Sequence, residues 1–146
     1  MSPEQIESIY DDGEPSEARR LLLLEAERGD AVAQFYLGHL CTEENPRDDA
    51  GAVEWYKKSA SGGSWLGTHY LASHMYFGLG TPQDIEAALE LFRKSAEAGL
   101  DASQWKLGQH LLSESSDRSE ALKWLKLAAA QGHQAAMELL RASGDA

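Results

Sequence analysis

The sequence predicts an all-α protein built as a right-handed α–α superhelix, a solenoid of about four helix-turn-helix repeats. Three observations lead to this prediction. Four glycines recur with apolar residues at fixed distances on either side, and the segments before them have the apolar spacing of amphipathic helices. All variation in repeat length falls in one segment between two expected helices, where a surface loop tolerates insertion.

The repeat is defined by Gly29, Gly63, Gly99 and Gly132. An alanine stands eleven residues before each glycine, another alanine stands three before it, and a leucine stands eight after it. The position eight before the glycines holds Leu21, Trp55, Leu91 and Trp124, which we expect in the core. One domain therefore covers 1–146, with a cap helix and first half-repeat at 1–29, repeats at 30–63, 64–99 and 100–132, and a C-terminal helix at 133–146.

Local chemistry predicts where the helices begin and end. The four glycines supply left-handed C-cap residues, and Ser2-Pro3-Glu4-Gln5 has the pattern of a capping box. Asn45-Pro46-Arg47-Asp48 and Thr81-Pro82-Gln83-Asp84 predict an N-cap, a first-turn proline and an acid at the third helical position. Small residues beside the repeat leucines should let two helices approach closely; they are Gly38, Ala72 and Gly108.

The stretch LASHMYFGLGTPQDIEAALELFRKSAEAG, residues 71–99, resembles the Sel-1-like repeat family, a variant of the tetratricopeptide solenoid. The resemblance covers nearly the whole chain from about residue 14. It departs from the family pattern in the loops CTEENPRD and LSESSD, which lack Gly-x-Gly, and at Ala72, where glycine is usual. The family implies adaptor, assembly or inhibitory roles through protein contacts, and it does not imply a chemistry.

Charge limits the class of partner. The net charge of −11 disfavours nucleic acid and anionic membrane, because both bind clustered Lys and Arg. Residues 1–50 hold 13 acidic and 4 basic side chains, which either make a solubilising cap or steer a basic partner toward this end. With no apolar run long enough for a membrane span and no signal-peptide pattern, we expect a cytoplasmic protein, and we expect a monomer.

No residue pattern predicts catalysis, a cofactor or a metal. His69 and His74 diverge by about 140° around a helix. His74 and His110 occupy equivalent repeat positions, but two ligands make a poor zinc site. Gly78-Leu79-Gly80 is explained as a left-handed turn between helices, and we expect Cys41 to be a buried, inert thiol.

The expected binding surface is the concave inner face. Phe35, His69 and Trp105 each lie six residues after a repeat glycine, about 140° from the direction of the helix-pair contacts, and should therefore face outward. The predicted partner-binding residues are Phe35, His39, His69, Ser73, Tyr76, Trp105, Gln109 and Leu112.

These observations favour a non-enzymatic scaffold or adaptor that binds a partner protein or peptide on its concave face, and a basic partner would suit the acidic charge. An alternative is an acidic inhibitor or immunity-type protein that neutralises a toxin or enzyme by direct binding. A hydrolase-like enzyme ranks last, because no nucleophile and base stand in a known catalytic pattern.

Overall fold

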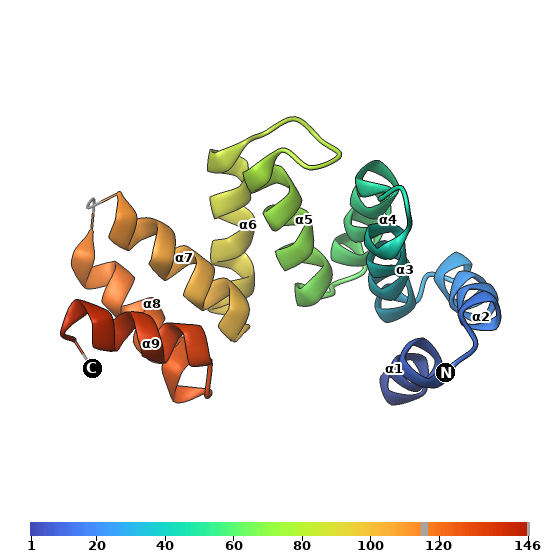
Figure 1. Cartoon of the computed structure of the whole chain (residues 1–146), viewed down its shortest axis with the longest axis horizontal. Helices are drawn as coiled ribbons and strands as arrows, with labels where there is room; N and C mark the ends of the chain where they lie inside the picture. The colour runs from blue at the N-terminus through green and yellow to red at the C-terminus, as the bar shows by residue number, and fades with distance from the viewer. Residues whose placement is uncertain (115–116, 146) are drawn as a thin grey trace. The chain divides into compact units, whose positions relative to one another are not determined.

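The computed structural model describes residues 1–114 and 117–145, and within those ranges the chain forms nine α-helices and no strand (Figure 1). The predicted all-α helical-repeat fold is confirmed. Residues 115–116 of the LSESSD loop and residue 146 of the expected C-terminal helix lie outside the described residues. The helices are α1 Pro3–Asp12, α2 Pro15–Glu27, α3 Ala31–Glu43, α4 Asp49–Ser61, α5 Trp65–Phe77, α6 Ile85–Glu97, α7 Asp101–Ser113, α8 Arg118–Ala130 and α9 Gln134–Ser143.

The chain divides into two compact units, Met1–Ala88 and Leu89–Ala146. Unit 1 holds α1 to α5 and the first turn of α6, and unit 2 holds the rest of α6 with α7 to α9. In each unit, helices that follow one another along the chain pack against one another, as in α3 with α4 and α7 with α8.

The helix ends confirm one prediction and correct another. Ser2 and Gln5 form the expected capping box, and the four repeat glycines have φ between 89° and 101°, a region that favours glycine. The predicted N-caps Asn45 and Thr81 are wrong, because α4 and α6 begin later. Asp48 instead accepts a hydrogen bond from the Gly51 N–H, and Asp84 accepts one from the Ala87 N–H, so each acid caps its helix and the proline precedes it.

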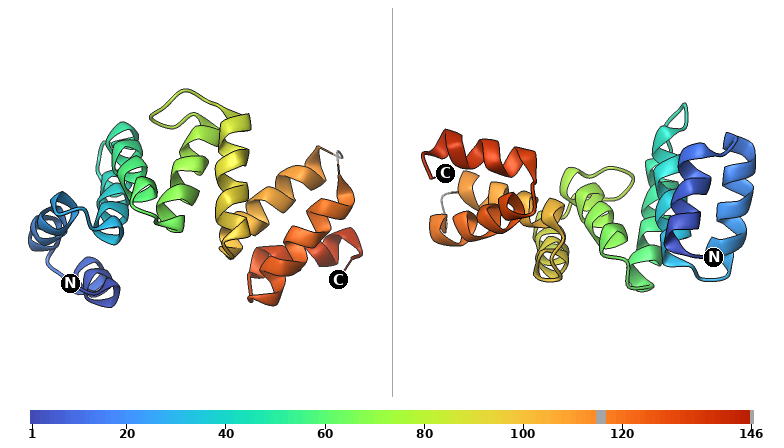
Figure 2. Two further views of the ribbon diagram at one scale, coloured as in Figure 1. Left: turned by 180° about the vertical axis from the view of Figure 1, so that it is seen from behind. Right: turned by 90° about the horizontal axis from the view of Figure 1, so that it is seen from below.

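In unit 1, α1, α2 and α3 lie side by side around an apolar core (Figure 2). The fully buried residues of this core are Ile6, Leu22, Ala26, Ala33 and Leu37. Gly38 lies directly against the ring of Tyr56 on α4, and a Cβ added there would overlap that ring. The expected close approach at this glycine is confirmed.

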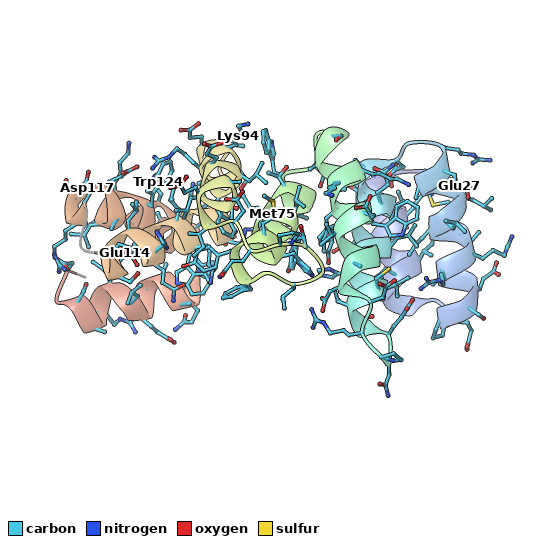
Figure 3. All side chains as sticks on the ribbon, turned by 90° about the horizontal axis from the view of Figure 1, so that it is seen from above. Glu27, Met75, Lys94, Glu114, Asp117 and Trp124 are labelled. Atoms are coloured by element: carbon cyan, nitrogen blue, oxygen red, sulfur yellow. The ribbon has the colours of Figure 1, made fainter. Side chains whose placement is uncertain are left out.

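In unit 2, two apolar clusters support the helix stack. Trp124 is 6% exposed and packs with Ala96 and Leu107, which confirms its expected place in the core (Figure 3). The second cluster comprises Leu125, Ala128, Ala136 and Leu140. Gly108 again marks a close approach, since a Cβ there would lie 2.8 Å from Leu125 Cγ.

Trp55 corrects a prediction about the core. It is only half-buried: it packs at the margin of the unit 1 core, and the ammonium group of Lys58 lies 4.4 Å from its ring centroid. Tyr56, the next residue, is fully buried instead, because it fills the space that Gly38 leaves open. The indole of Trp55 therefore covers the core and does not fill it.

A buried glutamine ties successive helix pairs together in both units. Gln34 Nε2 donates to the Ala26 carbonyl at 3.1 Å, and Gln104 Nε2 donates to the Ala96 carbonyl at 3.2 Å. Both glutamines lie five residues after a repeat glycine, and both reach back to the last turn of the preceding helix, where carbonyl groups lack helical partners. The same two carbonyls also accept from the N–H groups of Gly29 and Gly99, so each glutamine adds a second hydrogen bond at the corner of the repeat.

A charged network ties the loop before α4 to α5. Arg47 donates to Asp49, whose Oδ1 lies 3.2 Å from His74 Nε2, and His74 Nδ1 lies 2.9 Å from the Tyr70 carbonyl. Both ring nitrogens of His74 thus lie within hydrogen-bonding distance of an oxygen atom. Hydrogen bonding to Arg47, aided by His74, holds the pKa of Asp49 below its usual value.

We predict that Ala96→Trp destabilises the protein by about 2 kcal/mol or more, because Ala96 is 1% exposed between Leu107 and Trp124 and an indole there overpacks the core. Ala130→Trp, a matched change at an exposed position near the end of α8, should cost less than about 0.5 kcal/mol. Urea midpoints measure both; equal midpoints would contradict the helix packing described above.

We predict that Asp49→Asn lowers the free energy of unfolding by about 1–2 kcal/mol at pH 7, because it weakens hydrogen bonds to Arg47 and His74. The folded-state pKa of Asp49 is depressed, so its stabilisation is present above the ordinary Asp pKa and is lost as the pH falls below about 4. The two proteins should therefore converge in acid. Glu86→Gln, the same charge change in the first turn of α6, is the control, and an equal loss there would rule out a specific network.

Candidate interaction surface

Unit 1 carries a layer of aromatic side chains supplied by α1, α3 and α5. Tyr10, Tyr36, His39 and Tyr70 are partly exposed, and we call these four residues the aromatic face. Tyr36 and Tyr70 both lie seven residues after a repeat glycine, so the same position of successive repeats contributes a ring. Helix α1 adds Tyr10 because its apolar residues Ile6 and Ile9 hold it against the unit 1 core.

The rings contact one another without a gap. The centroids of Tyr10 and Tyr36 are 4.6 Å apart, those of Tyr10 and His39 are 6.4 Å apart, and those of His39 and Tyr70 are 4.6 Å apart. These distances lie within the range of favourable aromatic pairs. Beneath them Phe35 and Tyr56 are buried and contact the same rings. The aromatic face is therefore held rigidly by side chains that belong to the core.

Carboxylates border the aromatic face. The Tyr10 hydroxyl donates to Glu43 Oε1 at 2.7 Å, and partial burial with this contact raises the pKa of Tyr10. Partial burial, with Glu7 and Asp11 nearby, also raises the pKa of Tyr36. Both phenols stay neutral at physiological pH, so the surface combines polar rings with nearby negative charge.

His39 links the aromatic face to the interior. Its Nδ1 lies 2.8 Å from the hydroxyl of the buried Tyr56, and burial lowers the pKa of His39. A neutral imidazole with its proton on Nε2 accepts a hydrogen bond at Nδ1 from the Tyr56 hydroxyl, so His39 satisfies a polar group that would otherwise be buried without a partner. His39 was predicted as a binding residue, and this contact gives it a structural role as well.

Phe35 does not face outward, and that expectation is wrong. It is 5% exposed and lies within 5.4 Å of the Tyr70 ring, measured between centroids. This position points away from the partner helix of its own repeat, but α3 also packs against α5 of the next repeat. The Phe35 side chain, at the sixth position after the glycine, is therefore buried in the contact between α3 and α5.

The other predicted residues of unit 1 lie on α5. His69 and Tyr76 are half-buried, and their rings contact Tyr70 and Phe77. Ser73 is half-buried and its hydroxyl donates to the His69 carbonyl at 3.1 Å. Among these three residues, His69 is the one whose ring contacts the aromatic face.

The predicted residues of unit 2 occupy different environments. The Trp105 ring stacks on His133 with centroids 5.2 Å apart, and it packs against the cluster around Leu125. Leu112 packs against the same cluster, while Gln109 is exposed on α7. Trp105 is thus half-buried against α9, in the same way that Phe35 packs against the next repeat.

Sequence reasoning missed Tyr10, Tyr36 and Tyr70. The signal for two of them was available, because the seventh position after Gly29 and Gly63 holds tyrosine in both repeats. Tyr10 had no such signal, since it lies outside the repeats and reaches the surface only through the packing of α1 on α3.

The sequence offered three further candidates for chemistry: Cys41, the histidines and the Gly78-Leu79-Gly80 turn. Cys41 is 3% exposed, as expected, and burial raises the pKa of its thiol. In the described part of the chain, no three His, Cys, Asp or Glu side chains gather as metal ligands. Gly78 and Gly80 have φ of 69° and 66°, the left-handed turn predicted between helices.

None of the helices within the described ranges combines the length and apolarity needed to cross a bilayer.

Two curated relatives are similar over part of their length. An uncharacterized protein of Neisseria meningitidis serogroup B is 36% identical over 111 residues, which cover 74% of this chain and 23% of that protein. DAP3-binding cell death enhancer 1 of Rattus norvegicus is 32% identical over 96 residues, covering 66% of this chain and 19% of that protein. The chain thus spans less than a quarter of either relative.

Solved structures show the same fold. A Sel1 repeat protein from Oxalobacter formigenes matches with a TM-score of 0.72 and 28% identity over 82% of this chain and 94% of that one. A protective antigen of uropathogenic Escherichia coli, which displays the SLR fold, matches with a TM-score of 0.70 and 32% identity over 82% of this chain and 27% of that one.

The family model for the Sel1 repeat matches residues 31–64, 66–100 and 101–133, about two thirds of the chain. This fold commonly mediates protein–protein interaction and is generally a non-enzymatic scaffold. The repeat spacing, the stacked helix pairs and these matches together show that the chain belongs to the Sel1 repeat family.

Proposed function

We propose that this protein is a non-enzymatic interaction module that binds a partner protein through the aromatic face of unit 1. The observation that carries the proposal is the row of partly exposed rings held in place by Phe35 and Tyr56 beneath them. Rigid aromatic side chains lose little conformational entropy on binding, and Tyr and Trp are enriched among residues that dominate binding energy.

The carboxylates around the aromatic face support a basic partner. Glu7, Asp11 and Glu43 lie close enough to affect the tyrosines, and residues 1–50 carry 13 acidic against 4 basic side chains. Opposite charge on a partner would speed its encounter with this end of the chain.

In unit 2, a second predicted contact region comprises Trp105, Gln109 and Leu112. We also propose that the protein acts as a monomer.

A second candidate function is inhibition of a basic toxin or enzyme by direct binding. The uneven charge favours it, since tight inhibitors of basic proteins use acidic surfaces for fast association. Both functions use the same surface, and they differ in whether the partner loses its activity when bound.

We predict that Tyr36→Ala and Tyr70→Ala each weaken partner binding by about tenfold or more, as loss of an interface aromatic does. Trp65→Ala is the matched control, because Trp65 is 46% exposed on α5 and lies outside the aromatic face. Proteins captured from cells by the wild type, the Tyr variants and the control are compared by mass spectrometry, after circular dichroism shows that each is folded. Support requires a protein retained by the control and lost by both Tyr variants. Equal retention by all four would disprove binding at this face.

We predict that affinity for the captured partner falls as salt rises from about 0.05 M to about 0.5 M, because screening shortens the reach of exposed charges below about 10 Å. Titration calorimetry or anisotropy at several salt concentrations measures the slope. An affinity that is constant across this range would leave the aromatic face as the binding surface but would exclude a basic partner.

A further inference from the structure

The C-terminal ends of α1 and α3 and the first turn of α2 enclose a groove. One hollow of about 260 Å³ is lined by Tyr10, Asp11, Gly13, Pro15, Ala18, Leu40 and Glu43. A second of about 410 Å³ shares Pro15, Leu40 and Glu43 with the first and extends to Ser16, Arg19 and Glu44. Tyr10 and Glu43 connect this groove to the aromatic face, because the Tyr10 ring contacts Tyr36 and its hydroxyl donates to Glu43.

The charges in the groove favour a cation. Arg19 pairs with Glu44 at 2.7 Å, so that carboxylate is already neutralised. Within the described part of the chain, neither Asp11 nor Glu43 forms an ion pair. Both stand in the last turn of their helices, where the backbone carries partial negative charge, and neither helix has a basic residue in that turn. Acids at this end of a helix oppose its dipole, which disfavours their charge, although Glu43 also accepts a hydrogen bond from Tyr10.

The lining of the groove favours a guanidinium group over an ammonium group. Pro15, Ala18 and Leu40 make an apolar lining, and the Tyr10 ring adds an aromatic surface. A guanidinium group is planar and weakly hydrated, it stacks on aromatic rings, and it can donate to two carboxylates at once. An ammonium group is compact and strongly hydrated, and it loses more on entering an apolar groove.

We propose that this groove is a docking site for an arginine side chain on a partner protein, with the guanidinium between Asp11 and Glu43 and its stem along Leu40 and Pro15. The inference rests on the proposed function and adds to it the residue type that the partner presents. The partner would lay an extended segment over the aromatic face while its arginine enters the groove beside Tyr10.

The test uses the full chain and three short probes: acetyl-Gly-Arg-Gly-amide and its lysine and citrulline counterparts. Citrulline keeps the size of arginine but removes its charge. Each probe is titrated into isotopically labelled protein while backbone amide shifts are recorded. We expect saturable shifts at Asp11, Gly13, Leu40 and Glu43 with the arginine probe, at least about threefold weaker binding of the lysine probe, and no saturation with citrulline.

Two double variants of equal charge change complete the experiment. Asp11→Asn with Glu43→Gln removes both carboxylates of the groove, and the Gln oxygen can still accept from Tyr10. Glu27→Gln with Glu90→Gln removes two exposed acids elsewhere; Glu27 ends α2 at the opposite end from Pro15 (Figure 3). The groove variant should weaken the arginine probe about tenfold, and the remote variant by less than about twofold.

Equal weakening by both variants, or shifts spread over the whole acidic surface, would show nonspecific attraction and overturn the proposal. Equal affinity for the lysine probe would overturn the choice of arginine. These failures are separate from failure of the proposed function, because capture of a partner through Tyr36 and Tyr70 does not depend on any of the three short probes.

Discussion

The close approach of neighbouring helix backbones is the constraint on which the rest of this structure depends. Gly38 receives the ring of Tyr56, Gly67 lies against Ser59, and Gly108 lies against Leu125; a Cβ at any of the three would collide. Between other helix pairs, Gln34 and Gln104 donate buried hydrogen bonds to carbonyl groups of the preceding helices. Small residues thus fix the distance, and the buried polar contacts then fix the register.

The same packing produces the aromatic face. Because α3 contacts both α4 and α5, Phe35 is buried between repeats, while the next residue, Tyr36, is left at the surface. Tyr56 enters the core beside Gly38, and its hydroxyl then needs His39 as a partner. The proposed binding surface is therefore an outer layer of the core, and its rings would need little ordering when a partner binds.

The charged side chains of unit 1 include a paired network and two acids that form no ion pair with any residue the structure describes. Arg47, Asp49 and His74 form a network that stabilises the fold, and each charge in it faces an opposite one or a hydrogen-bond partner. Asp11 and Glu43 stand where helix dipoles oppose them. Placing acids there disfavours their charge, and docking of a partner's arginine in the proposed groove would offset that cost.

The sequence by itself determined the helical repeat, its glycine stops, the close approach at Gly38 and Gly108 and the burial of Trp124, because these follow from spacing along one chain. Three features were decided only by the tertiary structure: the burial of Phe35, the partial exposure of Trp55 and the contact of Tyr10 with Tyr36. Helical periodicity gives the direction of a side chain within one helix pair. It does not say which third helix covers that direction, and in a stacked repeat the next repeat decides whether a ring is core or surface.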